Sequence, residues 1–320
     1  MLYPLSYEGA PTHSTGFTCH AGFMTVWIDQ PLWPAHGTMF AHMVSDSRLS
    51  ELHDVAERTG LSPRAFDQDH YDVPEHLVAE AVAQGAIHVT PHELVRRLIA
   101  SPLRIPAKER PAKIRARLLR NWEEWAPDHP ELGRRVLDRW ESPDRGYHSS
   151  VHLGEVLEHV STLERQSSLD AASRRILRAT AWYHDAVYNG KPGHDESQSA
   201  QLCASDLAGV LPPDEVRRAS ELIMATSDHT QDRPDPLWPY FHDADLGILA
   251  AASPRYDRYA AAVRTEYSHV PGPEFRAARA TILEGFLAQP FIYLTAPARE
   301  SWEERARENI SAEVRRLRGA

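Results

Sequence analysis

A change in apolar periodicity divides this sequence of 320 residues at the proline-rich stretch "SPLRIPAKERP", residues 101–111. Before it, short strand-like runs alternate with helical ones, whereas after it the spacing is helical throughout and no strand pattern competes. Three prolines among several charges are typical of a linker. We therefore predict a two-domain chain, with a small N-terminal α/β domain at residues 24–104, a linker at 105–112 and an all-α domain at 113–320.

The expected elements follow from the same spacing. In the first domain, "TVWID" and "FAHMVSD" predict strands, while "SRLSELHDVAERTGL", "PEHLVAEAVAQ" and "PHELVRRLI" predict helices. The second of these helices stops at Gly85 and leads into a further short strand, "AIHV". In the second domain we predict helices at about 113–126, 130–141, 149–165, 170–188, 195–209, 213–227, 242–250, 254–268, 272–288 and 299–317. Residues 1–23 show neither periodicity. We expect them to be a disordered or wrongly assigned leader, with Met24 as the natural start.

Charge and composition exclude several classes of protein. The formal net charge is -10, and the one basic cluster, at residues 108–120, is typical of a solvated helix face. This balance argues against nucleic acid as a partner. No apolar run approaches the ~18 residues that a membrane span needs. The two cysteines, Cys19 and Cys203, lie far apart and fit a reducing compartment. We expect a cytoplasmic protein without membrane contact, and the sequence does not indicate its oligomeric state.

Histidines and carboxylates recur at positions from which they can bind one common ion or small molecule. His148 and His152, in "YHSSVHL", lie one helical turn apart on a common face. His184 and Asp185 stand in the apolar stretch "AWYHDAVYNG", close to the helix-breaking "NGKPG", and Asp245 lies in the apolar run "FHDADLGIL". A buried charge is costly unless it is paired or bound to a metal. Imidazoles and carboxylates from three helices would suit a divalent ion.

The order of one histidine (His152), a histidine–aspartate pair (His184 and Asp185) and one aspartate (Asp245) in an all-helical domain resembles the HD-domain superfamily of metal-dependent phosphohydrolases. The resemblance is strongest to a bacterial subgroup of predicted metal-dependent phosphohydrolases and covers roughly residues 113–318. It is carried by "YHSSVHL", "WYHDAVYNG", "ATSDH", "FHDADLGILA", "VRTEYSHV" and "ARENISAEVRRL". The first stretch is also similar to the signature of cyclic-nucleotide phosphodiesterases. However, Ser149 stands where asparagine is usual, which weakens a specific assignment to cyclic nucleotides.

The resemblance implies a function and roles for individual residues. His152, His184, Asp185 and Asp245 match the positions that hold a divalent metal, which would be Mn, Mg, Fe, Co, Ni or Zn. The implied reaction is hydrolysis of a small phosphate ester, such as a nucleotide, by a metal-activated water. His148 would be the general acid, and Asp185 or Asp245 would orient the water.

Further residues are candidates for contact with the substrate or with a second metal. They are His229, Arg145, Glu196, Arg264 and Tyr267. Two other functions stay open. The helical domain could be a regulatory module that binds a ligand without catalysis, or a di-iron oxygenase, for which His229 would supply an additional ligand.

The first domain resembles a small bacterial domain of unknown function. "MTVWIDQPLWP", "FAHMVSDS" and "DQDHYDVPEH" carry this likeness, which implies no chemistry. Polar and aromatic side chains could converge at the strand ends, where open α/β sheets often bind ligands. The candidates are Asp29, Trp33, His42, Asp46, His70, Tyr71 and Asp72. One hypothesis is that this domain senses or presents the substrate of its neighbour.

Overall fold

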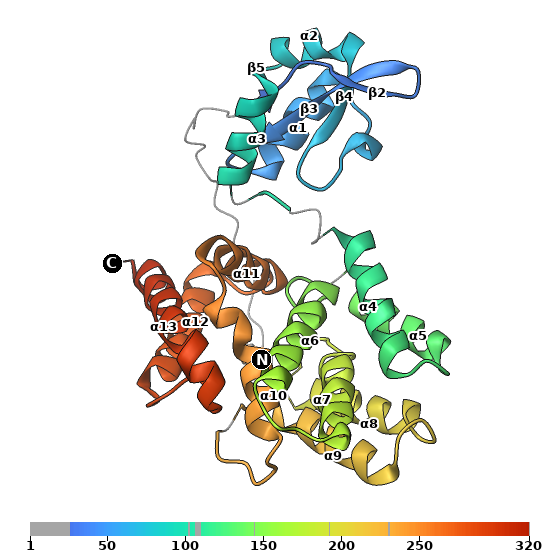
Figure 1. Cartoon of the computed structure of the whole chain (residues 1–320). Coiled ribbons are helices and arrows are strands. Elements are labelled where there is room, and N and C mark those ends of the chain that lie inside the picture. Colours follow the sequence, from blue (N-terminus) through green and yellow to red (C-terminus); the bar gives the residue numbers. More distant parts are fainter. Residues whose placement is uncertain are drawn as a thin grey trace. The chain divides into compact units, whose positions relative to one another are not determined.

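The computed structural model of the chain, shown in Figure 1, describes residues 26–101, 103–105, 110–143, 145–191, 193–229 and 231–319. The predicted leader, together with Met24, lies outside these residues. The described chain divides into two compact units, with the boundary between Arg110 and Pro111 inside the predicted linker. Each unit is described by itself.

The N-terminal unit is a small α/β structure, as the change in periodicity predicts. Strand β3 is the centre of its sheet: it pairs antiparallel with β1, β2 and β4, and β1 also pairs parallel with β5. The elements are β1 (Val26–Ile28), β2 (Trp33–Ala35), β3 (Thr38–Ser45), α1 (Leu49–Thr59), a 3-10 turn (Pro63–Ala65), β4 (Tyr71–Pro74), α2 (Glu75–Ala83), β5 (Ile87–His88) and α3 (Pro91–Ala100).

The two faces of this sheet have different surroundings. Successive strand residues point to opposite faces. Ala41 and Met43 of β3 pack into the apolar core with residues of α1 and α2. On the other face, Val44 packs against Leu94 and Leu98 of α3. Two positions before Val44 on the same face is His42, whose side chain stays 26% exposed.

The C-terminal unit is helical throughout its described residues. Its helices are α4 (Pro111–Trp125), α5 (Pro130–Trp140), α6 (Ser150–Arg165), α7 (Ala171–Tyr183), α8 (His194–Asp206), α9 (Pro213–Ala225), α10 (Trp238–Asp245), a 3-10 helix (Leu246–Ala250), α11 (Ser253–Glu266), α12 (Gly272–Ala288) and α13 (Ala296–Arg318). Helices α6, α7 and α10 pack against one another in the middle of this unit (Figure 1).

Large aromatic side chains fill the core of the helical unit. Trp122, Trp140, Trp182 and Trp238 are fully buried. Their indole N–H groups need partners once they leave water. Trp140 donates to the carbonyl of Trp182 at 2.9 Å, and Trp122 donates to the carbonyl of His129 at 2.9 Å. These bonds connect α4, α5 and α7 next to the histidine of α6 and the histidine that follows α7.

The predicted division into a small α/β region and a helical region is confirmed, but two predicted helices have an end displaced by four residues or more. The helix predicted at 170–188 ends at Tyr183, and the one predicted at 242–250 begins earlier, at Trp238, and continues as a 3-10 helix. Strands β2 and β4 were not predicted. Across the described residues, no helix combines the length and the apolar character needed to cross a membrane.

Candidate metal centre

Three central helices bring four of the predicted residues together. His152 lies in the first turn of α6, and His184 directly follows the last residue of α7, with Asp185 next to it. Asp245 is the last residue of α10. The helix ends at Tyr183, so both His184 and Asp185 lie past its last residue. The two neighbouring side chains can therefore reach the same point, which two consecutive helical residues would not do.

The ligand atoms of these residues surround a common point. His152 Nε2 lies 3.1 Å from His184 Nε2 and 3.1 Å from Asp245 Oδ1, and His184 Nε2 lies 3.5 Å from Asp245 Oδ1. Asp185 Oδ2 is 3.4 Å from His184 Nε2 and 3.9 Å from His152 Nε2. All four side chains are at most 3% exposed. Two imidazoles and two carboxylates thus share one buried pocket of polar atoms.

Hydrogen bonds orient both imidazoles with Nε2 toward the cluster. His184 Nδ1 donates to the carbonyl of Ala181 at 2.9 Å, so that the neutral ring carries a lone pair on Nε2. His152 Nδ1 is 2.8 Å from the hydroxyl of Tyr147. Burial lowers the pKa of His152. Burial also opposes charging of His184, but Asp185 and Asp245 outweigh it and raise the pKa of this imidazole.

This donor set fits a divalent cation. Two neutral imidazole nitrogens facing each other at 3.1 Å would repel unless a proton or a cation lay between them. Two buried carboxylates next to them call for compensating positive charge. Imidazole and carboxylate together suit Zn, Fe, Mn, Co or Ni better than Ca. His152, His184, Asp185 and Asp245 are therefore the residues that could hold such an ion.

His148 lies beside the cluster and not within it. Its Nε2 is 4.0 Å from Asp185 Oδ2, and its Nδ1 is 2.5 Å from Glu266 Oε1. The other oxygen of Glu266 accepts from the backbone N–H groups of Gly146, Tyr147 and His148. Burial opposes ionisation of Glu266, but the contact with His148 outweighs it and lowers the pKa of this carboxyl to about 2. The geometry places His148 where it could transfer a proton near the cluster.

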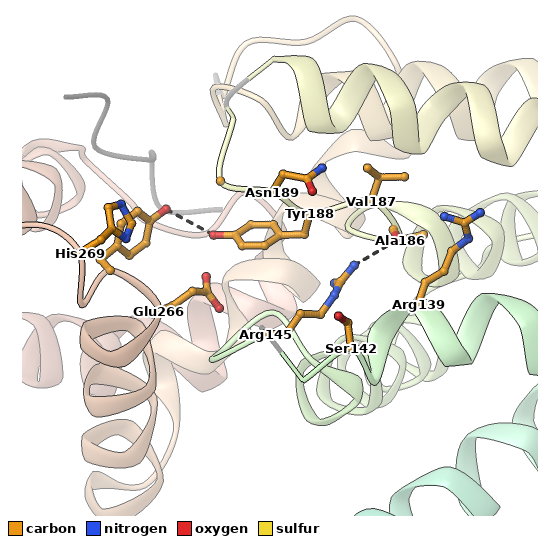
Figure 2. Close-up of a pocket in the computed structure, with 11 residues that line it drawn as sticks. Arg139, Ser142, Arg145, Ala186, Val187, Tyr188, Asn189, Glu266 and His269 are labelled. Carbon is orange, nitrogen blue, oxygen red and sulfur yellow. Dashed lines mark hydrogen bonds between the residues drawn. The ribbon is translucent and has the colours of Figure 1, made fainter. Parts of the chain in front are cut away.

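A cavity of about 570 Å³ lies next to His148. Figure 2 shows its lining, which includes Arg139, Tyr188 and Glu266. The rings of Tyr188 and His148 stack with centroids 4.2 Å apart. His148 therefore contacts the wall of the cavity on one side and faces the carboxylate of Asp185 on the other.

Arg145 also lines this cavity, but most of its donors are used by the backbone. It donates to the carbonyls of His148 and Asp185 at 2.7 Å each and to that of Ala186 at 3.0 Å, the last bond being drawn in Figure 2. One guanidinium thus fixes the segment that carries Asp185 against the start of α6. The predicted contact with a substrate phosphate remains a prediction.

His229 and Glu196 lie close to the cluster. His229 Nε2 is 3.3 Å from Asp245 Oδ2, and its φ of 49° is uncommon for a residue other than glycine. Glu196 is 1% exposed, and its Oε2 has no hydrogen-bond partner among the described residues. Burial, and then the charge of Asp185, raise the pKa of Glu196. The contact of His229 with Asp245 and the charge interaction of Glu196 with Asp185 thus link both side chains to the carboxylates of the cluster.

Arg264 and Tyr267 have different surroundings. Arg264 donates to the carbonyls of Tyr267 and Val270, which stabilises the end of α11. It lines a different cavity from the one beside His148. The hydroxyl of Tyr267, by contrast, lies 3.3 Å from that of Tyr188 in the cavity of Figure 2.

The N-terminal candidates separate onto the two faces of the sheet. Asp29, His42 and His70 gather on one face. Tyr71 points to the other face, where its hydroxyl bonds to His53 Nδ1 at 2.9 Å. The side chain of Tyr71 therefore lies in the core and does not face the side chains of His42 and His70.

Sequence reasoning missed Glu266, although it selected residues on both sides of it. The overlooked signal is electrostatic. A carboxylate at the last position of a helix is unfavourable beside the negative end of the helix dipole, so another partner has to hold it there.

Asp243 shows how an adjacent carboxylate serves structure. It accepts from the backbone N–H groups of Leu294 and Thr295 at 2.7 Å each, at the start of α13. This bonding explains its burial without any ligand.

Comparison with known proteins gives a match to a family model within the N-terminal unit. A search of the curated proteins found no match. Residues 26–101, which span every strand and helix of the N-terminal unit, match the family model described as "Protein of unknown function (DUF4031)".

Proposed function

We propose that the helical unit is a divalent-metal-dependent phosphohydrolase that acts on a small phosphate ester such as a nucleotide. The observation that carries this proposal is the convergence of His152 Nε2, His184 Nε2 and Asp245 Oδ1, which lie within 3.5 Å of one another, with Asp185 Oδ2 3.4 Å from His184 Nε2 and 3.9 Å from His152 Nε2. An ion held there would polarise a phosphoryl oxygen and activate a water molecule.

The residues around the cluster support specific roles. Glu266 fixes the ring of His148 through Nδ1, so that Nε2 points toward Asp185. A proton carried by this Nε2 could be donated to a departing oxygen. Asp185, whose Oδ2 lies 4.0 Å from His148 Nε2 and 3.4 Å from His184 Nε2, would orient the attacking water. Arg145 holds both segments in this relation through their carbonyls.

The adjacent cavity supports a substrate of nucleotide size. Its volume of about 570 Å³ is in the range of small-molecule sites. Arg139 offers a planar guanidinium to a phosphate, and Tyr188 and Tyr267 offer aromatic surfaces to an organic group. We propose that the ester enters from this side and that its phosphate passes His148 to reach the cluster.

Elemental analysis combined with a panel of phosphate esters tests the proposal. The full chain should carry a divalent metal and release phosphate from at least one ester. His184→Ala should lose one equivalent of metal per chain, that of the helical unit, together with the activity, whereas His148→Asn should keep that equivalent and lose about 10²–10⁴-fold in turnover. His129→Ala, at an exposed histidine of the same unit, is the matched control and should change neither.

The alternatives give different results in the same assay. Bound metal without turnover of any ester would favour a regulatory module. Bound iron with oxygen consumption would favour a di-iron oxygenase, in which His229, 3.3 Å from Asp245, would serve the second ion. Turnover by a His184→Ala variant that has lost the metal equivalent of the helical unit would refute the proposed mechanism.

A further inference from the structure

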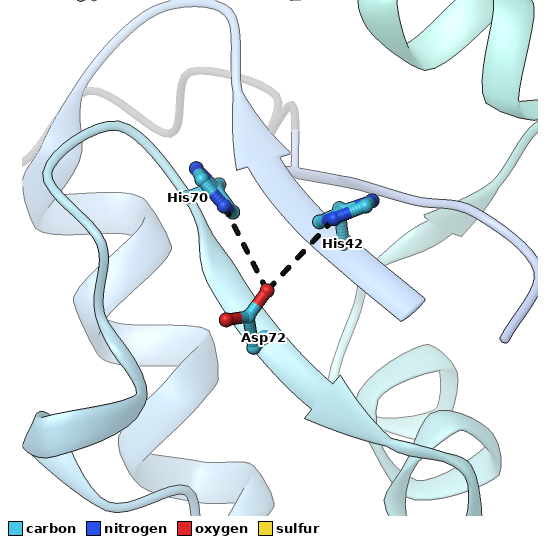
Figure 3. Close-up of side chains that lie close together, drawn as sticks. All are labelled: His42, His70 and Asp72. Carbon is cyan, nitrogen blue, oxygen red and sulfur yellow. Dashed lines mark ion pairs between the residues drawn. The ribbon is translucent and has the colours of Figure 1, made fainter. Parts of the chain in front are cut away.

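A second group of histidines and carboxylates lies on the face of the N-terminal sheet that carries Val44 and α3, at a part where His42 stays partly exposed. It consists of His42, His70 and Asp72, shown in Figure 3, with Asp29 and Asp69 behind the two histidines. None of these residues belongs to the helical unit, and the group does not depend on the function proposed above.

Strand register explains why the group forms. His42 on β3 lies directly opposite Asp72 on β4 in the antiparallel ladder, and His70 comes two residues before Asp72. Residues opposite each other, and residues two apart, share one face of a sheet. The backbone N–H of Asp29, which directly follows β1, donates to the carbonyl of His42 at 3.1 Å. Three neighbouring chain segments thus present their polar side chains to the same place.

Each imidazole is held by a buried carboxylate through Nδ1. His70 Nδ1 is 2.7 Å from Asp69 Oδ1, and His42 Nδ1 is 3.4 Å from Asp29 Oδ2. Asp29 also accepts from the backbone N–H of His42 at 2.7 Å, so its position is fixed. A carboxylate on one ring nitrogen makes the other a better metal ligand, and this pairing recurs behind histidines that bind metals.

The two Nε2 atoms point toward one oxygen of Asp72. The distances to Asp72 Oδ1 are 3.7 Å from His70 and 3.9 Å from His42. Both are longer than a hydrogen bond allows. They are close to the roughly 3.4 Å that separates two ligand atoms around a tetrahedral ion with bonds of about 2.1 Å. A small movement of Asp72, whose side chain is 48% exposed, would close the remaining gap.

We infer that His42 Nε2, His70 Nε2 and Asp72 Oδ1 form a binding site for a divalent transition-metal ion. Asp29 and Asp69 orient the two histidines. Three protein ligands on one side of the ion leave at least one position open toward solvent, where water or an external ligand could bind. Two imidazoles favour zinc or iron over magnesium and calcium, which prefer oxygen ligands.

Zinc binding to the full chain tests this inference. The metal-free chain is dialysed against buffered Zn²⁺, and bound zinc per chain is measured together with affinity by calorimetry. His42→Gln/His70→Gln should lose one equivalent relative to the unmodified chain, whatever the helical cluster binds. Asp29→Asn should keep the site but weaken it by roughly 10–100-fold. Magnesium at the same concentration should not compete.

Two controls keep the result interpretable. His76→Gln alters an exposed histidine of α2 in the same unit and should bind as much zinc as the unmodified chain. Asp72→Asn changes a half-exposed side chain, so it should weaken binding while thermal unfolding of the metal-free chain stays unchanged. The same variants are also made in a chain that carries His152→Ala/His184→Ala. This chain should bind one zinc equivalent, and adding His42→Gln/His70→Gln should remove it. Equal zinc content and affinity in all variants would overturn the inference.

Discussion

Replacing Glu266 by glutamine should destabilise the helical unit at neutral pH and do so less strongly in acid. The pKa of this carboxyl is about 2 in the folded protein against an ordinary 4.5. Because the folded value is the lower one, ionised Glu266 stabilises the fold at pH values above 4.5, and the effect is lost as the pH falls toward 2. A difference of about 2.5 pKa units corresponds to about 3 kcal/mol.

The side chain of Glu266 is only 6% exposed, so solvent screening does not reduce this figure much. The same relation gives about 2 kcal/mol near pH 3.5, because at this pH the carboxyl of the unfolded chain binds a proton whereas that of the folded chain does not. The difference in unfolding free energy between the unmodified chain and Glu266→Gln should therefore shrink by roughly 1 kcal/mol between pH 7 and pH 3.5.

Urea unfolding followed by tryptophan fluorescence at several pH values measures both quantities. Asp257→Asn is the matched control on the same helix, α11. Asp257 pairs with Arg316 at 2.9 Å, but its side chain is 45% exposed, so its removal should cost less than about 1 kcal/mol at any pH. If Glu266→Gln cost no more than this control, or if its cost did not change with pH, the argument from the buried pair with His148 would be refuted.

Three further predictions concern packing and the metal centre. A Cβ on Gly133 would lie 2.4 Å from the fully buried ring of Trp122, so Gly133→Ala should lower unfolding stability by about 1–3 kcal/mol in urea titrations. Arg145→Ala should weaken metal binding measured by calorimetry by about tenfold or more, because the carbonyl of Asp185 loses its donor; unchanged affinity would contradict this positioning role. Chelation of the metal should lower the melting temperature measured by calorimetry, since Asp185 and Asp245 then lack a compensating cation; an unaltered melting curve would argue against a bound ion.

The local spacing of apolar residues was sufficient to predict most of the helices. The apolar period of the helical unit is a property of neighbouring residues, so α4, α5 and α6 begin and end within two residues of their predicted bounds. The end of α7 was missed because the apolar stretch continues through Tyr188, although the helix stops at Tyr183. Proline at the second position of α10 was an available sign of its early start.

Short strands were harder to predict. Strands β2 and β4 have three and four residues, too few to show an alternating pattern. Their stability comes from pairing with β3, which depends on residues far away in the sequence. The same pairing placed Tyr71 in the core and His70 and Asp72 on the opposite face.

The sequence by itself determined the kinds of side chain at each candidate position, the helices that carry them and the boundary between the two units. Periodicity, proline and charge act within one or two helical turns, so these features can be read locally. Only the tertiary structure decided which side chains meet. His152 and Asp245, 93 positions apart, lie 3.1 Å from each other, and His148 and Glu266, 118 positions apart, lie 2.5 Å from each other. Such distances depend on how whole helices pack. Burial of the apolar helix faces sets the positions of the helices, and these in turn set the positions of the polar side chains between them.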